Sequence, residues 1–193
     1  MTIKDRFRLL SEDILAEVHY TYKQVSFEWQ RQDGSWQKQD REVLDRGHGA
    51  AILPYDPARS TVLLIRQFRY PAFEAGYDGL LIEAAAGLLD DADPETRIRL
   101  EAEEELGYSL HDVQRVFTSF MSPGSVTEQI HFFISRYDPS MKTSAGGGKA
   151  DEGEDIDVLE MSIEDAMDMV RNGQICDAKT IMLLQHAALT IFA

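Results

Sequence analysis

The stretch "LEAEEELGY", residues 100–108, places four glutamates within five positions and follows them with a glycine. A helix advances by about 100° per residue, so Glu101, Glu104 and Glu105 fall within an arc of about 100° while Glu103 points almost the opposite way. Like charges four residues apart destabilise a helix, and oxygen ligands are those that Mg²⁺ and Mn²⁺ prefer. The spacing alone leaves two interpretations open, a divalent-metal site and a solvated acidic face.

A second acidic segment, "KTSAGGGKADEGED", covers residues 142–155 and contains three consecutive glycines. A glycine-flanked acidic segment is typical of a flexible surface loop. The same composition also suits a catalytic loop that carries a carboxylate base to a bound substrate. The residues of this segment by themselves favour the surface loop.

Composition limits the classes of partner. The chain has 193 residues, 44% of them hydrophobic, and a formal net charge of −15, which indicates a globular protein and argues against nucleic acid or an anionic membrane as a partner. The single cysteine, Cys176, excludes an internal disulfide and a cysteine-based zinc site. The charged N-terminus lacks a signal-peptide region, and no apolar run approaches the ~18 residues of a membrane span. We therefore expect a soluble, cytoplasmic protein.

The first 45 residues alternate polar with aromatic or apolar side chains, and Asp33-Gly34 lies between two such runs. This pattern predicts a hairpin within a small antiparallel sheet. Such a sheet is too thin to be stable alone, so we expect it to pack on the rest of the chain or on a second subunit. The pattern changes near residue 46.

The remaining chain mixes strands and helices without a strict alternation. The acidic helix is predicted from Pro94 to about Leu106, capped by Asp93 and ended by Gly107. Later helices are predicted from Ser162 to Gly173 and after Asp177. The fold class is therefore α/β, with a mixed sheet and helices on both faces. Strands are predicted at 50–56, 60–70, 113–120, 130–138 and 156–161.

The segment "GLLDDADPETRIRLEAEEELGY", residues 87–108, resembles the Nudix box, a glycine followed by an acidic loop and a glutamate-rich helix. Two positions depart from that motif. The loop is one residue short, so Asp93 replaces the first box glutamate or that glutamate is absent. Leu100 stands where the box has an arginine that braces the glutamates, and Arg97 is the candidate replacement.

The resemblance extends over nearly the whole chain, to the nucleoside-diphosphate-sugar branch of the Nudix superfamily and most strongly to bacterial GDP-mannose pyrophosphatases. It implies a Nudix α/β/α sandwich with a mixed sheet, preceded by a small N-terminal antiparallel β domain that is exchanged across a homodimer. We accordingly predict an N-terminal domain at residues 1–46 and a hydrolase domain at residues 47–193. The segments that carry the likeness are "REVLDRG", "LIRQFRY", "IEAAAGLLD", "MSPGSVTE", "GGGKADEGEDI" and "CDAKT".

Metal and catalytic roles follow from the resemblance, position by position. The implied cofactor is Mg²⁺, with Mn²⁺ as an alternative. The backbone carbonyl of Ala86 and the side chains of Glu101, Glu105 and Glu154 would be metal ligands. Glu104 would be a further ligand or a catalytic support, and the predicted catalytic base that activates water is Glu152.

Substrate contacts are implied in the same way, and some have ordinary alternatives. Arg69 could also be a surface arginine at a strand end, and Lys179 a solvent lysine in the first turn of a helix. His19 and Tyr20 are the candidates for stacking on a base, and the contacts on residues 40–42 would come from the other subunit. The predicted substrate-binding residues are His19, Tyr20, Asp40, Arg41, Glu42, Arg69, Ala86, Gly87, Glu105, Glu128, Glu152 and Lys179.

The expected reaction is Mg²⁺-dependent hydrolysis of the diphosphate bond of a nucleotide sugar, with GDP-mannose giving GMP and mannose 1-phosphate. An ADP-ribose or ADP-sugar pyrophosphatase is the alternative within the same superfamily. A Nudix-like module that binds a nucleotide without cleaving it is the non-enzymatic alternative. The last is disfavoured because the glutamates of the box and of the loop are present.

Overall fold

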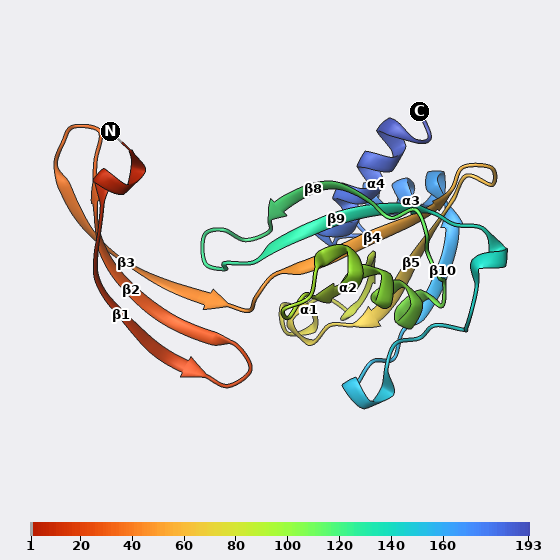
Figure 1. Cartoon of the computed structure of the whole chain (residues 1–193), viewed down its shortest axis with the longest axis horizontal. Coiled ribbons are helices and arrows are strands. Elements are labelled where there is room, and N and C mark those ends of the chain that lie inside the picture. Colours follow the sequence, from red (N-terminus) through yellow and green to blue (C-terminus); the bar gives the residue numbers. More distant parts are fainter. Residues whose placement is uncertain (1) are drawn as a thin grey trace. The chain divides into compact units, whose positions relative to one another are not determined.

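The structure, a computed structural model, describes residues 2–193 and contains two compact units (Figure 1). The first consists of the residues up to His48 together with Phe120–Gln129. The second consists of Gly49–Ser119 and Ile130–Ala193. The predicted boundary between two folding domains after residue 46 is not tested by these units and stays a prediction. No helix within residues 2–193 is both long and apolar enough to cross a membrane.

The N-terminal unit is a three-stranded antiparallel sheet with the order β1-β2-β3. A predicted hairpin joins β2 to β3, and at its turn Gly34 has a φ of 86° while Ser35 donates to Asp33. The positive φ explains why glycine occupies that position. A short 3₁₀ turn precedes the strands; the elements are η1 (Ile3–Arg6), β1 (Phe7–Glu17), β2 (Thr21–Gln30) and β3 (Trp36–Asp45).

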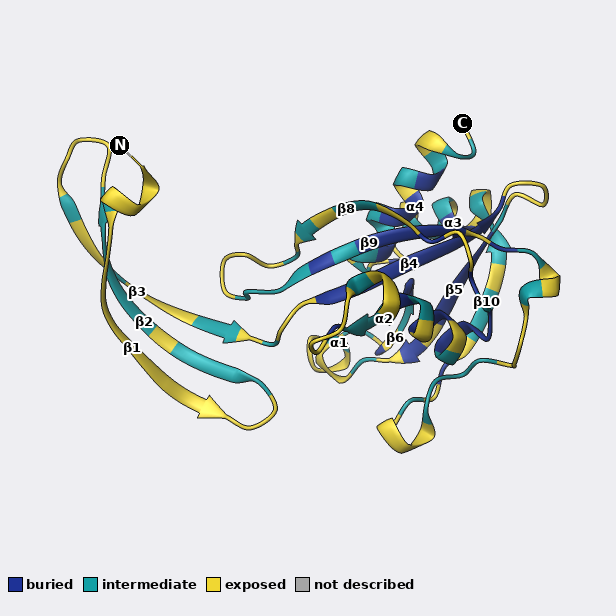
Figure 2. Cartoon of the chain, viewed as in Figure 1, coloured by how far each residue is buried: buried dark blue, intermediate teal, exposed yellow. Residues whose placement is uncertain are grey.

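Strand β1 is an uncovered edge of this sheet. All of its residues are exposed, as the yellow ribbon in Figure 2 shows, although several are large and apolar. Leu9, Leu10, Ile14 and Leu15 each retain at least 50% of their accessible surface. An apolar edge strand of this kind is a site for association, because its outer backbone groups can pair with another strand and its exposed apolar side chains can be covered by another surface.

The second unit is built on a seven-stranded mixed sheet. Strand β4 runs parallel to β9 and antiparallel to β5 and β7, which confirms the predicted mixed sheet. The order is β10-β5-β4-β9-β8, with β6 paired to β5 and β7 paired to β4. The strands are β4 (Gly49–Asp56), β5 (Thr61–Phe68), β6 (Leu80–Glu83), β7 (Ala85–Leu88), β8 (Gln114–Phe120), β9 (Gln129–Arg136) and β10 (Asp157–Ser162).

Helices cover both faces of this sheet, as predicted. In Figure 1, α2 lies in front of the sheet, and α3 and α4 lie behind it. The predicted acidic helix is present, but its last turn is π-helical and forms η2. Helix α1 and the two 3₁₀ turns of this unit were not predicted. The elements are α1 (Tyr70–Glu74), α2 (Pro94–Glu101), η2 (Ala102–Leu106), η3 (Pro139–Met141), η4 (Ala150–Glu152), α3 (Ile163–Arg171) and α4 (Ala178–Thr190).

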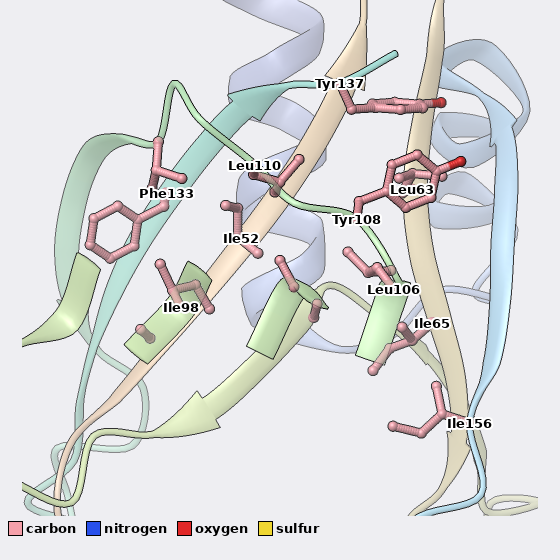
Figure 3. Close-up of a cluster of buried hydrophobic side chains, with 14 of the residues drawn as sticks. Ile52, Leu63, Ile65, Ile98, Leu106, Tyr108, Leu110, Phe133, Tyr137 and Ile156 are labelled. Atoms are coloured by element: carbon pink, nitrogen blue, oxygen red, sulfur yellow. The ribbon is translucent and has the colours of Figure 1, made fainter. Parts of the chain in front are cut away.

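The hydrophobic core fixes the rotation of the acidic helix (Figure 3). Ile98, Ala102 and Leu106 are fully buried and belong to one cluster with Ile52 and Leu63 of the sheet. Their spacing of four residues defines the apolar stripe of the helix. That stripe faces the sheet. Glu101 and Glu105, which immediately precede Ala102 and Leu106, are therefore also directed toward the interior.

Candidate functional site

The acidic helix begins and ends at local signals in its sequence. Asp93 accepts hydrogen bonds from the amides of Glu95 and Thr96 at 3.1 and 3.0 Å, and Pro94 occupies the first turn. Gly107 ends the helix with a φ of 78°, a left-handed conformation that favours glycine. Cap, proline and terminal glycine all lie where the sequence predicts them.

Two glutamates of this helix lie below the protein surface. Glu101 is 4% exposed and Glu105 is 1% exposed. The amide of Ala86 on β7 donates to Oε2 of Glu105 at 3.0 Å. The guanidinium of Arg97 contacts Oε1 of Glu101 at 2.5 Å and also donates to the carbonyl of Leu88 at 3.1 Å. The arginine one turn earlier therefore braces Glu101, as the box arginine would.

Gly87 allows the carboxylate of Glu101 to lie against the backbone of β7. A Cβ atom at this glycine would lie 2.0 Å from Oε1 of Glu101, which is far inside contact distance. Any side chain at this position would displace the carboxylate. The predicted role of Gly87 as a substrate contact stays a prediction, whereas its steric role follows from this distance.

The glycine-rich segment docks on the end of the acidic helix. The amides of Gly147 and Gly148 donate to the carbonyls of Glu105 and Glu104 at 2.9 and 3.0 Å. A Cβ atom at Gly146 would lie 2.4 Å from the carbonyl oxygen of Glu105. The loop thus satisfies carbonyl groups that a helix end leaves without partners. Its glycines serve this close backbone contact and bring the acids that follow them beside the helix.

The acids of the loop meet a lysine. The ammonium of Lys149 lies 2.8 Å from Oε2 of Glu104 and 3.2 Å from Oε1 of Glu152. The amide of Lys149 donates to Oε2 of Glu154 at 2.8 Å. Glu152 is exposed and Glu154 is half-buried. The side chain of Lys149, which was not among the predicted residues, therefore joins one predicted glutamate of the helix to one of the loop.

Two cations that are predicted to contact the substrate share a buried carboxylate. Nε of Arg69 lies 2.8 Å from Oε2 of Glu83, and the ammonium of Lys179 lies 2.5 Å from Oε1 of the same group. Glu83 is 3% exposed. Glu83 was not among the predicted residues, although a lone acid in the apolar run "LLIEAAAG" indicates a buried charge that needs partners. Glu83 fixes the spacing of the two cations.

The predicted contacts of the N-terminal unit include a small aromatic and charged cluster. The rings of His19 and Tyr20 lie 4.5 Å apart, and the guanidinium of Arg46 lies 5.4 Å from the Tyr20 ring. Arg46 also contacts Oε1 of Glu128 at 3.4 Å. Arg46, which was not among the predicted residues, therefore contacts two of them, Tyr20 and Glu128.

The remaining predicted contacts lie on β3. Tyr22 donates to Glu42, and Ser26 donates to Asp40. Arg41 lines an apolar groove of about 610 Å³ together with aliphatic and aromatic residues of the same unit. The roles of these residues in substrate binding stay predictions.

Comparison with known proteins places the chain in a family. Residues 6–44 match the family "GDP-mannose pyrophosphatase NudK N-terminal domain". The chain is 47% identical over 180 residues to the GDP-mannose pyrophosphatase of Pectobacterium atrosepticum, which covers 93% of this chain and 92% of that protein. The protein of the same name from Cronobacter sakazakii is 47% identical over 182 residues, with 94% of each chain covered. The chain belongs to the GDP-mannose pyrophosphatase family.

A solved structure supports the fold of this family member. The crystal structure titled "ADP compounds hydrolase" superposes with a TM-score of 0.73 and 17% identity, covering 95% of this chain and 93% of that one. At this identity the likeness concerns the fold alone. The predicted Nudix sandwich with its N-terminal antiparallel sheet is confirmed.

We call the carboxylates of Glu101, Glu104, Glu105, Glu152 and Glu154 and the carbonyl of Ala86 the acidic centre. In this GDP-mannose pyrophosphatase family member, burial and charge repulsion raise the pKa values of two of these carboxylates. Burial, together with the carboxylates of Glu101 and Glu154, raises the pKa of Glu105 to about 8, and the amide of Ala86 opposes that change. Burial also raises the pKa of Glu101, against the opposing charge of Arg97. Like charges that are held together in this way favour a bound cation.

The residues of the centre fit a divalent metal in their chemistry. Their donors are carboxylate and carbonyl oxygens, the set that Mg²⁺ and Mn²⁺ prefer. Within residues 2–193, no three His, Cys, Asp or Glu side chains are already arranged to hold a metal ion. Arg97 and Lys149 are paired with Glu101 and Glu104 instead, so metal binding requires these carboxylates to turn. The assignment of Mg²⁺ stays a prediction.

The metal-free protein is expected to lose stability as the pH rises from about 5 to about 8. Glu105 has an ordinary pKa of 4.5 and a folded-state pKa of about 8, so between these values the folded chain keeps a proton that the unfolded chain has released. The unfolded state then binds fewer protons, and the free energy of unfolding falls with rising pH. Urea unfolding in EDTA at pH 5 and pH 8 measures this change.

The matched variants for that measurement are Glu105→Gln and Glu103→Gln. Glutamine at 105 keeps an oxygen acceptor for Ala86 and removes the titration, so the pH-dependent loss should largely disappear. Glutamine at the exposed position 103 should leave the loss in place. The same loss in both variants would contradict the role given to Glu105.

Replacing Glu83 by alanine is expected to lower the free energy of unfolding by about 3 kcal/mol. Arg69 then loses its carboxylate partner, and Lys179 retains its contact with Asp177. The same variant should bind a nucleoside diphosphate less tightly, since Arg69 and Lys179 lose their common anchor. Glu74→Ala, at an exposed carboxylate, is the control. Urea unfolding and equilibrium binding provide the two measurements, and equal stability of both variants would contradict the prediction.

Proposed function

We propose that this chain hydrolyses the diphosphate bond of GDP-mannose to GMP and mannose 1-phosphate, with Mg²⁺ as cofactor. The observation that carries the proposal is the identity of 47% to proteins named GDP-mannose pyrophosphatase, over more than nine tenths of the chain. The glutamates, the paired cations and the glycine-rich loop lie within the same compact unit, which supports a hydrolytic site there. A cytoplasmic location is our expectation and is supported by the single cysteine.

The metal would be held by Glu101, Glu105 and Glu154 with the carbonyl of Ala86, and Glu104 would add a ligand or support. When bound, Mg²⁺ would neutralise charge on the diphosphate and promote ionisation of a water molecule. The burial of Glu101 and Glu105 keeps bulk water away from these ligands, which strengthens their interaction with any cation.

The side chains of this unit divide the remaining tasks. Glu152 lies on a loop with its carboxylate exposed, so it can accept the proton of the attacking water. The water oxygen bonds to one phosphorus atom as the bridging P–O bond breaks, and the bond electrons remain on the departing phosphate. Arg69 and Lys179, aligned by Glu83, bind phosphate oxygens and stabilise the charge that develops there.

We further propose a homodimer in which the N-terminal unit is exchanged. The exposed apolar residues of β1 support this proposal, because a three-stranded sheet with an uncovered apolar edge gains stability by association. Ile14→Asp and Leu10→Asp should shift the mass measured by light scattering toward that of a monomer. A dimer that withstands both substitutions would place the interface elsewhere.

A panel of nucleotide sugars tests the proposed substrate. GDP-mannose, ADP-ribose and an ADP-hexose are incubated with the protein and Mg²⁺, and phosphate is measured after phosphatase treatment of the products. We expect the highest kcat/KM for GDP-mannose. A higher value for ADP-ribose would replace the proposal by the ADP-ribose alternative, and binding without turnover of any substrate would favour the non-catalytic module.

A further inference from the structure

Lys149 is the cation that touches the acids of both the helix and the loop. Its ammonium contacts Oε2 of Glu104 at 2.8 Å and Oε1 of Glu152 at 3.2 Å. These two glutamates come from segments that are almost fifty residues apart in the sequence, and each has a role in the proposed reaction. A single charged side chain therefore connects the acidic helix to the predicted catalytic base.

The backbone of the loop does not depend on that ammonium. The carbonyl of Lys149 accepts from the amides of Glu152 and Glu154 at 3.0 and 3.1 Å, and its amide donates to Oε2 of Glu154 at 2.8 Å. The amides of Gly147 and Gly148 also hold the loop on the helix end. A substitution at position 149 can thus remove the positive charge while these backbone bonds remain.

The ammonium occupies a region where carboxylates crowd. Glu104 and Glu152 contact the ammonium, Glu154 accepts from the backbone amide of the same residue, and Glu101 and Glu105 are buried residues of the same acidic helix. A positive charge there offsets their mutual repulsion. A divalent cation bound by the same glutamates would repel the ammonium and compete with it for Glu104.

We propose that Lys149 is a positioning residue that acts as a tethered counter-ion: it holds Glu104 and the segment 149–154 together in the metal-free centre, and a divalent cation displaces it. The inference depends on the proposed function for the identity of the metal site. Displacement also releases the carboxylate of Glu152 from its contact with the ammonium. Metal binding and release of the base are thereby coupled through one side chain.

Binding of Mn²⁺ to the full-length protein tests the displacement. Titration calorimetry and electron paramagnetic resonance of free Mn²⁺ give Kd for the wild type and for Lys149→Met. We expect the variant to bind Mn²⁺ about fivefold more tightly, which corresponds to removal of one competing, partly exposed ion pair. A role limited to structural support would predict weaker binding.

Two control variants separate the local contact from the change in net charge. Lys142→Met removes the same charge from a lysine whose ammonium lies 5.8 Å from the ring centre of Tyr108, and its Kd should stay within about twofold of the wild type because screening weakens distant charges. Lys149→Arg keeps the charge at the centre and should keep Kd close to that of the wild type.

Hydrogen exchange in EDTA tests the tether without metal. Amides of 149–154 should exchange about three- to tenfold faster in Lys149→Met than in the wild type, because the loop loses its contact with the helix. Unchanged exchange, or a Kd that is unchanged or higher in Lys149→Met, overturns the inference. If the wild type fails to bind Mn²⁺, the proposed metal site is overturned together with the displacement. If the wild type binds Mn²⁺ but Lys149→Met does not bind it more tightly, only the displacement is overturned.

Discussion

Glu105→Gln is expected to lower kcat/KM for GDP-mannose by about a thousandfold. The residue is 1% exposed and accepts from the amide of Ala86, so its carboxylate is fixed in the centre that would hold the metal. A bound metal contributes several kcal/mol to a reaction of this type, and each 1.36 kcal/mol changes the rate tenfold. Steady-state kinetics at saturating Mg²⁺ measure the loss.

Glu103→Gln is the matched control for this substitution. The same helix carries both residues, the chemical change is identical, and Glu103 is exposed on the opposite side. Its kcat/KM should remain within about twofold of the wild type. If Glu105→Gln retained full turnover, the buried face of this helix would not be the metal site.

Glu152→Gln is expected to lower kcat by about 10² to 10⁴-fold with little change in substrate affinity, because a general base contributes in that range. The exposed carboxylate of Glu152 contacts Lys149, and none of the observed contacts gives it a role in the core. The variant should therefore fold normally. Rapid-quench measurements of kcat and equilibrium binding of GDP-mannose separate chemistry from binding.

Asp151→Asn is the control for the loop. This neighbouring carboxylate is exposed and was not assigned a role, so its loss should leave kcat nearly unchanged. A normal rate in Glu152→Gln would assign the base to another residue. Equal losses in both variants would indicate that the charge of the loop matters rather than one carboxylate.

Local sequence predicted the features that depend on near neighbours. The acidic helix begins after Asp93 and ends at Gly107 because caps and left-handed glycines act within a few residues. The hairpin at Gly34 follows for the same reason. Helical spacing also placed Glu101 and Glu105 on one side of the helix, whereas their burial became evident only in the folded chain. The π-helical last turn did not alter this, because the buried stripe of the helix fixes its rotation.

Contacts between distant segments could be found only in the folded chain. Glu83 meets Arg69 and Lys179, which lie 14 and 96 positions away, and no local pattern pairs them. The contact of Lys149 with Glu104 arises because a glycine-rich loop docks on a helix end. Periodicity and capping are short-range effects that a sequence determines by itself. Burial and ion pairing depend on which remote segments the hydrophobic core brings together, so the tertiary structure decided the partners of these charges.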